Sequence, residues 1–155
     1  MTRAVVERVL AAHASRDTEA LAHCYTAEAT VWPTGWPLPV PAMEWVNAVP
    51  LFLESFPDMH LEPVRIVADG SVAMAELQMT GTNLGPLHLN DTDRRLLRTT
   101  AESLPPSGRS MTLDGVAVFV LHKNLVAVER HYWLYEDSLA QLGHLDPAPA
   151  NLGAP

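Results

Sequence analysis

The sequence predicts an α+β fold in which three N-terminal helices pack on one face of a strongly curved antiparallel sheet. In the first half, apolar residues recur at helical spacing, whereas the second half alternates with the period of a strand. The length of 155 residues is that of one ordinary domain. We expect a single domain over residues 1–145, followed by a flexible Pro/Ala-rich tail over residues 146–155.

Two helices are expected at the N-terminus. Apolar side chains recur at helical spacing from Val5 to His13. Asp17 is a suitable N-cap for a second helix that carries Leu21 and Tyr25. The first part of the chain is therefore expected to be helical.

A proline-rich loop and a third helix are expected next. The strand-like run ATVW leads into PTGWPLPVP, where four prolines in nine residues exclude a central strand or a helix interior. We interpret this stretch as an ordered loop. Residues 43–56 place apolar side chains on one helical face, so a third helix is expected there, with a kink at Pro50.

The second half contains four strand-like runs, which read LEPVRIVAD, SVAMAELQMTGT, RSMTLDGVAVFVLH and LVAVERHYWLY. They are separated by DG, a long loop and HKN, an order that predicts a meandering antiparallel sheet. The long loop exceeds a hairpin connection, and loops of that length are usually functional or mobile. We expect residues 86–104 to form an irregular or partly helical rim over a pocket mouth.

Composition and charge narrow the expected partners and cofactors. The chain has 18 acidic residues against 10 Lys and Arg, which disfavours binding to nucleic acid or to anionic membranes. The N-terminus is too charged for a secretory signal, and no apolar run is long enough to span a membrane, so a cytoplasmic location is expected. The single cysteine, the histidine spacing and the glycine pattern predict no metal or redox cofactor. A small neutral or apolar ligand fits this composition.

Three ordered stretches carry a resemblance to a known family. They read FPDMHLEPVRIVADGSVAMAELQMTGTNLGPL, then PPSGR, then VAVERHYWLYEDSLAQLG. This pattern resembles the SnoaL-like polyketide cyclase family of the nuclear-transport-factor-2-like superfamily, from about Ala11 to Gly143. The resemblance implies a cone of three helices and a curved sheet around one apolar pocket, in a homodimer. It also implies aldol ring closure without metal or cofactor, with an aspartate as the acid or base.

Two positions of this chain differ from the family pattern. Counting back seven residues from Gln141 places the family's aspartate at Leu134, and the family's histidine falls on Asn83 in GTNLG. An asparagine can form hydrogen bonds but cannot take up a proton near neutral pH. Two replacement bases stay open, Asp137 if the alignment slides, and Glu76.

Strand alternation separates two faces over residues 127–134, and only one of them can line the pocket. One face carries Val128, Arg130, Tyr132 and Leu134, and the other carries Ala127, Glu129, His131 and Trp133. The resemblance places position 134 inward, so Arg130 and Tyr132 are expected to line the cavity and His131 to lie outside. A guanidinium beside a phenol can stabilise an enolate or carboxylate oxygen. The alternative is that Arg130 pairs with an acid such as Glu76 and that Tyr132 is a core residue.

The function expected from these residues is a cofactor-independent cyclase or related tailoring enzyme acting on a polyketide-like natural-product intermediate. Pocket-imposed folding of the substrate would be assisted by Arg130, Tyr132 and Asn83. The alternative is a non-catalytic binding module for a small apolar ligand. The residues expected to line the pocket are Tyr25, Trp32, Trp36, Phe52, Glu76 and Leu134.

Overall fold

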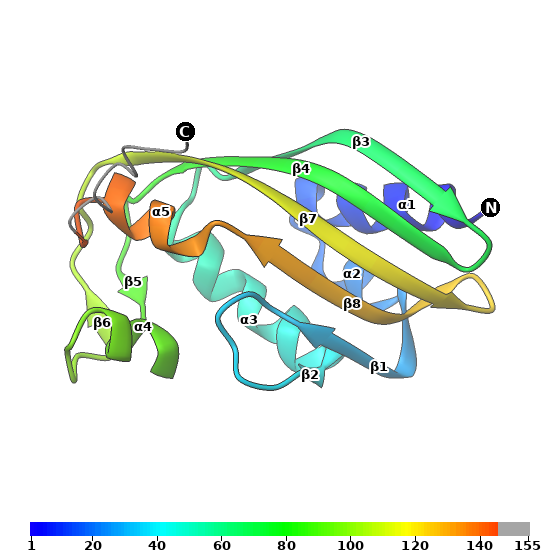
Figure 1. Ribbon diagram of the computed structural model, residues 1–155, viewed down its shortest axis with the longest axis horizontal. Helices are drawn as coiled ribbons and strands as arrows, with labels where there is room; N and C mark the ends of the chain where they lie inside the picture. Colours follow the sequence, from blue (N-terminus) through cyan, green and yellow to red (C-terminus); the bar gives the residue numbers. More distant parts are fainter. Residues whose placement is uncertain (146–155) are drawn as a thin grey trace, which may run out of the picture.

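The structure is a computed structural model that describes residues 1–145. A six-stranded sheet is covered by helices on one face, and a small ribbon with a short helix lies at one end (Figure 1). The tail expected over residues 146–155 lies outside the described residues. In chain order the elements are α1 (Thr2–Ser15), α2 (Thr18–Ala22), β1 (Tyr25–Trp32), β2 (Val40–Pro41), α3 (Ala42–Ser55), β3 (His60–Asp69), β4 (Val72–Thr82), β5 (Leu87–His88), α4 (Asp91–Leu96), β6 (Ser103–Leu104), β7 (Ser110–His122), β8 (Leu125–Trp133) and α5 (Tyr135–Gln141).

The three predicted N-terminal helices are confirmed, with one correction to the second. The carboxylate of Asp17 accepts a hydrogen bond from the backbone N–H of Ala20 at 2.9 Å, as expected of an N-cap. However, α2 ends at Ala22, and Tyr25 begins a strand, where it pairs with Val126 of β8. Sheet pairing therefore overrides the helical spacing of Tyr25. Among the described residues, no helix is long and apolar enough to cross a membrane.

The proline-rich loop is confirmed between β1 and α3. Residues 33–39 contain no helix or strand, and only Val40 and Pro41 pair with β1. The third helix runs without interruption from Ala42 to Ser55 with Pro50 inside it. The loop and the first turn of α3 thus come to lie beside the ends of β1 and β8, as Figure 1 shows.

The four strands predicted in the second half are confirmed as an antiparallel meander, but the whole sheet is mixed. The strand order is β2-β1-β8-β7-β4-β3. Neighbours from β3 to β8 pair antiparallel, whereas β1 pairs parallel to β8. The parallel pair arises because α3 and the meander lie between β1 and β8 in the chain. Such a long connection allows a parallel neighbour that a hairpin would exclude.

Small side chains face the helices at the centre of the sheet. Ala75 pairs with Ala117, which pairs in turn with His131, and both alanines are buried. On the next pleat, Glu76 pairs with Val116 and lies on the opposite face. Because alanine adds little height to the sheet, the helices can pack close to it at these positions. The register therefore decides which residues of β8 point toward the helices.

The expected rim over residues 86–104 is partly helical, as predicted. Leu87 pairs with Leu104, and α4 lies between them, beginning with a capping box formed by Asn90 and Asp93. Asp93 is almost fully buried, and its carboxylate accepts a hydrogen bond from the hydroxyl of Tyr135 in α5. Burial raises the pKa of Asp93. This one hydrogen bond connects the rim to the C-terminal helix.

Replacing Tyr135 with phenylalanine should loosen the rim. The variant leaves a buried oxygen of Asp93 without its donor, so the free energy of unfolding should fall by about 1–3 kcal/mol. Amide hydrogen exchange in α4 should become faster. His122→Gln is the control, because His122 is exposed at the end of β7, and it should change stability by less than about 0.5 kcal/mol. Equal losses in the two variants would contradict this account of the rim.

Candidate functional site

A polar cluster lies in the interior, on the helix-covered face of β8. Glu129 is only 2% exposed, and the side chain of His131 is 8% exposed. The hydroxyl of Tyr25, at the start of β1, donates to Oε2 of Glu129 at 2.5 Å. Nε2 of His131 lies 2.6 Å from the other carboxylate oxygen, Oε1. Two parallel neighbouring strands therefore supply a continuous Tyr25–Glu129–His131 relay.

The register of the sheet places Glu129 among apolar neighbours. It pairs with Val31 on one side and Phe119 on the other, and both are fully buried. Burial is the largest influence on the pKa of Glu129, and alone it would raise the pKa. Attraction to His131 and the hydrogen bonds from His131 and Tyr25 outweigh burial and lower the pKa. The carboxylate is therefore ionised at neutral pH.

Whenever His131 is neutral, the ionised carboxylate of Glu129 fixes its tautomer. Because a carboxylate only accepts hydrogen bonds, Nε2 of His131 must carry the proton. Nδ1 then holds the lone pair, and within residues 1–145 no hydrogen-bond partner occupies it. A carboxylate that orients an imidazole with a free ring nitrogen is the arrangement of a general base.

Two further side chains face this relay from the helices. The ring of Trp45, in α3, lies edge-on to the ring of His131, with centroids 5.0 Å apart and an angle of 67° between the planes. Its indole Nε1 is buried and has no hydrogen-bond acceptor in the described part of the chain. His13, in α1, interacts electrostatically with Glu129 and His131. Burial lowers the pKa of His13, so its imidazole is neutral at neutral pH.

The predicted placement of Arg130, Tyr132 and Leu134 is wrong. The alternation of β8 is as expected, but the opposite set of residues points inward. Tyr132 is 57% exposed, Leu134 is 63% exposed, and Arg130 is also exposed. Leu134 occupies the N-cap position of α5 and forms no wall of an interior pocket. The residues that sequence reasoning missed are Glu129 and His131, which it had assigned to the outer face.

The expected pocket wall is also largely displaced. Trp32 is 42% exposed on the outer face, where its indole N–H donates to the carbonyl of the partly buried Trp36 at 3.0 Å. Phe52 is partly exposed and packs against Phe56 with ring centroids 5.0 Å apart. Of the six residues expected in the wall, Tyr25 is the one that belongs to the relay.

The two alternative bases lie outside the relay as well. Glu76 is exposed on the outer face and lies 3.8 Å from the guanidinium of Arg65, so Arg65 takes the place expected for Arg130. Asp137 is exposed in the first turn of α5, where a carboxylate complements the helix dipole. Within residues 1–145, neither side chain forms a hydrogen bond or an ion pair with Glu129 or His131.

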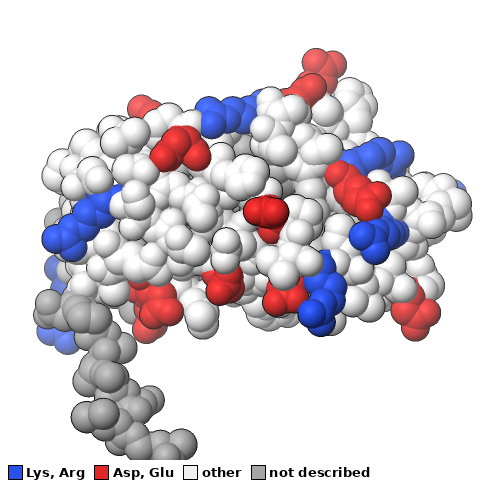
Figure 2. Space-filling model, turned by 90° about the horizontal axis from the view of Figure 1, so that it is seen from above, with Lys and Arg blue, Asp and Glu red and all other residues white. Residues whose placement is uncertain are grey.

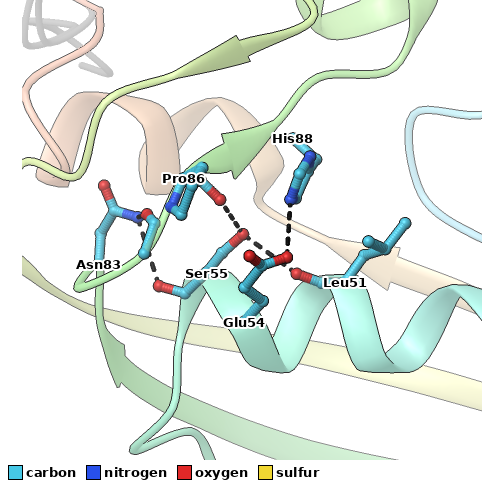
Figure 3. A network of polar contacts seen from close by, with 7 residues as sticks. Leu51, Glu54, Ser55, Asn83, Pro86 and His88 are labelled. Atoms are coloured by element: carbon cyan, nitrogen blue, oxygen red, sulfur yellow. Dashed lines mark hydrogen bonds and ion pairs between the residues drawn. The ribbon is translucent and has the colours of Figure 1, made fainter.

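Asn83 belongs to a second polar network, which connects loops to the end of α3 (Figure 3). Its side-chain Nδ2 donates to the carbonyls of Gly85 at 2.8 Å and Ser55 at 3.4 Å, and its Oδ1 accepts from the N–H of Ser107. The residue is fully buried. Both amide donors are thus used within the fold, and the network explains Asn83 as a connector of loops.

The interior relay is covered by side chains in this structure. Two shallow hollows lie elsewhere, one of about 240 Å³ between α1 and β3, and one of about 310 Å³ on α4. Trp45 packs against His131, and Trp133 lies on the same face of β8 and packs against the core; both are only partly buried. A ligand that reaches Nδ1 of His131 would have to displace such side chains.

Comparisons with known proteins identify the family and the fold. A family model described as SnoaL-like domain matches residues 6–129. No curated protein matches the sequence. The fold is shared with AclR of Streptomyces galilaeus, proposed to be a hydroxylase, at a TM-score of 0.75 and 17% identity, over 96% of this chain and 85% of that one.

Two further solved structures extend the comparison. IdmH of Streptomyces antibioticus, proposed to be a polyketide cyclase, has a TM-score of 0.73 and 18% identity, covering 92% of this chain and 99% of that one. A protein of Catenulispora acidiphila with a ketosteroid isomerase-like fold, solved with trimethylamine, has a TM-score of 0.69 and 14% identity, covering 94% and 97%. At these identities the likeness shows the fold alone, and it confirms the α+β class predicted from the sequence.

The lowered pKa of the partly buried His13 predicts how the free energy of unfolding depends on pH. Its pKa is lowered by burial from the ordinary value of 6.5, so below about that pH the unfolded chain binds a proton that the folded chain does not. The free energy of unfolding should therefore fall as the pH drops from about 7 toward 5, and His13→Gln should make this decline shallower. Urea unfolding at several pH values measures the slope. The control is His122→Gln at an exposed site, and an unchanged slope in His13→Gln would contradict the prediction.

Proposed function

Because the chain belongs to the SnoaL-like domain family, we propose that it catalyses a cofactor-independent ring closure, or a related tailoring reaction, on a polyketide-like natural-product intermediate. The observation that supports this function is the buried relay in which Glu129 orients His131. In this proposal, His131 replaces Arg130 and Tyr132 as the reactive group, because it is the side chain that points into the interior.

The reaction would begin with removal of a proton from a carbon next to a carbonyl. Nδ1 of His131 takes this proton, and the substrate becomes an enolate. The enolate carbon attacks a second carbonyl of the same molecule, which forms the new carbon–carbon bond and leaves an alkoxide. The imidazolium returns its proton to the alkoxide, so that protons and charge balance without a cofactor.

The relay stabilises the charged intermediate state of His131. When Nδ1 takes up a proton, the imidazolium lies 2.6 Å from the carboxylate of Glu129, in a site that excludes water. Burial and the neighbouring carboxylate raise the pKa of Tyr25 well above its ordinary value, so this hydroxyl keeps its proton and continues to donate. Tyr25 thereby holds Glu129 in place during the reaction.

The second candidate is a non-catalytic binding module for a small apolar ligand. The observation that favours it is the mainly apolar hollow between α1 and β3, which lies away from the relay. A module of this kind would bind without removing a proton from its ligand. Proton exchange therefore separates the two functions.

Exchange of the acidic protons of acetylacetone in heavy water, followed by proton NMR, tests the catalytic function. His131→Asn removes the base and should slow exchange by about a hundredfold or more, the scale for loss of a general base. Arg130→Gln and Tyr132→Phe on the outer face are the controls and should exchange at the wild-type rate. Unchanged exchange in His131→Asn would contradict the proposal, and binding without exchange in the wild type would favour the binding module.

We also propose that two copies pair through the outer face of the sheet. This face exposes apolar side chains that are unusual on a free surface: Trp32, Val67, Val72, Met74 and Tyr132. Seen from above, the surface is largely uncharged with scattered acidic and basic side chains (Figure 2), and on the outer face Glu76 lies 3.8 Å from the guanidinium of Arg65. Two such faces can meet without strong repulsion between like charges.

A charge on this face should separate the copies. Met74 is 50% exposed, so Met74→Asp should leave the core intact while placing two carboxylates in the interface. Light scattering after size exclusion should then give the mass of one chain. Leu51→Asp is the control, because Leu51 is equally exposed but lies on α3. A monomeric wild type would contradict the proposed pairing.

A further inference from the structure

We propose that the indole N–H of Trp45 binds an oxygen atom of the ligand, either a carbonyl oxygen or the enolate oxygen that forms from it. Trp45 lies in the first turns of α3, edge-on to the ring of His131. The inference rests on the proposed function for the identity of the base, but oxygen binding itself does not require turnover.

Nε1 of Trp45 is a buried hydrogen-bond donor. An indole nitrogen can only donate, and this one is removed from water without an acceptor in the described part of the chain. Buried donors in native proteins almost always have a partner, so an unpaired one calls for a missing acceptor. The contact with the imidazole ring is at most a weak N–H···π interaction and does not replace a full hydrogen bond.

A buried water is the alternative partner. It would need two to four polar partners of its own. His131 packs against the ring of Trp45, and its imidazole could supply one of them. A ligand oxygen would displace such a water and take over its hydrogen bond from Trp45.

The position next to His131 defines the chemical class of the ligand. Ring centroids 5.0 Å apart allow one small group to contact both side chains. A carbonyl oxygen at Trp45 would place the neighbouring carbon toward His131, so that the donor stabilises the negative charge that develops when the proton leaves. An amine or guanidinium at this point would bring its own N–H donors against the N–H donor of Trp45. The site therefore selects a flat ketone or diketone.

Binding of para-nitrophenolate, a stable mimic of a flat enolate, tests the inference by calorimetry. Trp45→Phe keeps an aromatic ring but removes the donor, so affinity should fall by about tenfold or more, the scale for a hydrogen bond to a charged oxygen. The matched ligand is para-nitrotoluene, which has no oxygen at this position and should bind both proteins equally. In nitrogen–proton NMR, the Trp45 indole resonance should shift with the phenolate and stay unchanged with the toluene.

Three results would overturn the inference: no phenolate binding to the wild type, equal phenolate affinity in Trp45→Phe, or an unmoved Trp45 resonance. The resonance is assigned by elimination with Trp32→Phe, Trp36→Phe and Trp133→Phe. If Trp45→Phe folds poorly, the shift of the Trp45 indole resonance in the wild-type protein is the deciding measurement. In a further outcome, the wild type binds the phenolate and shifts the Trp45 resonance without exchanging the protons of acetylacetone. That result would reject His131 as the base but would leave the oxygen site at Trp45 in place.

Discussion

The carboxylate of Glu129 must keep its hydrogen-bond partners, and much of the interior depends on this requirement. An ionised group with 2% exposure between Val31 and Phe119 is costly unless it is fully paired. Tyr25 can supply one donor because β1 begins with this residue and runs parallel beside β8. His131 supplies the other from two positions along the same strand. The parallel pairing of β1 with β8 and the tautomer of the imidazole thus both serve to pair the carboxylate of Glu129.

Periodicity was sufficient to predict most of the fold, because each element of the meander carries its own alternation. The strands β3, β4, β7 and β8 and the three helices lie close to their expected bounds. The parallel position of β1 could not be predicted in the same way. Its partner is supplied by a strand near the other end of the chain, and nothing in the short run ATVW indicates which strand that is.

The inward face of β8 was predicted wrongly from the sequence. In this strand the covered face carries buried ionisable side chains, the reverse of the usual pattern in which the covered face is apolar. Its covered face carries Glu129 and His131 beside Ala127 and Trp133, whereas its outer face carries Val128 and Tyr132 beside the charged Arg130. The pairing of neighbouring strands links the exposure of Glu76 to that of Tyr132. Glu76 pairs with Val116, and Val116 pairs with Tyr132, so an exposed Glu76 places Tyr132 outside as well. Single-strand alternation identifies the two faces but not which of them is covered.

The position of the relay also bears on the substrate. The family's aspartate position falls on Leu134, which lies beyond the end of β8 and outside the interior, whereas His131 lies within the strand. A base located there requires the reacting carbon to pass the partly buried ring of Trp45, which packs against His131. A flat substrate can insert between aromatic rings with little displacement, whereas a branched one would have to move α3 or the loop before it. The aromatic ring that packs against the relay would therefore restrict the ligand to a planar shape.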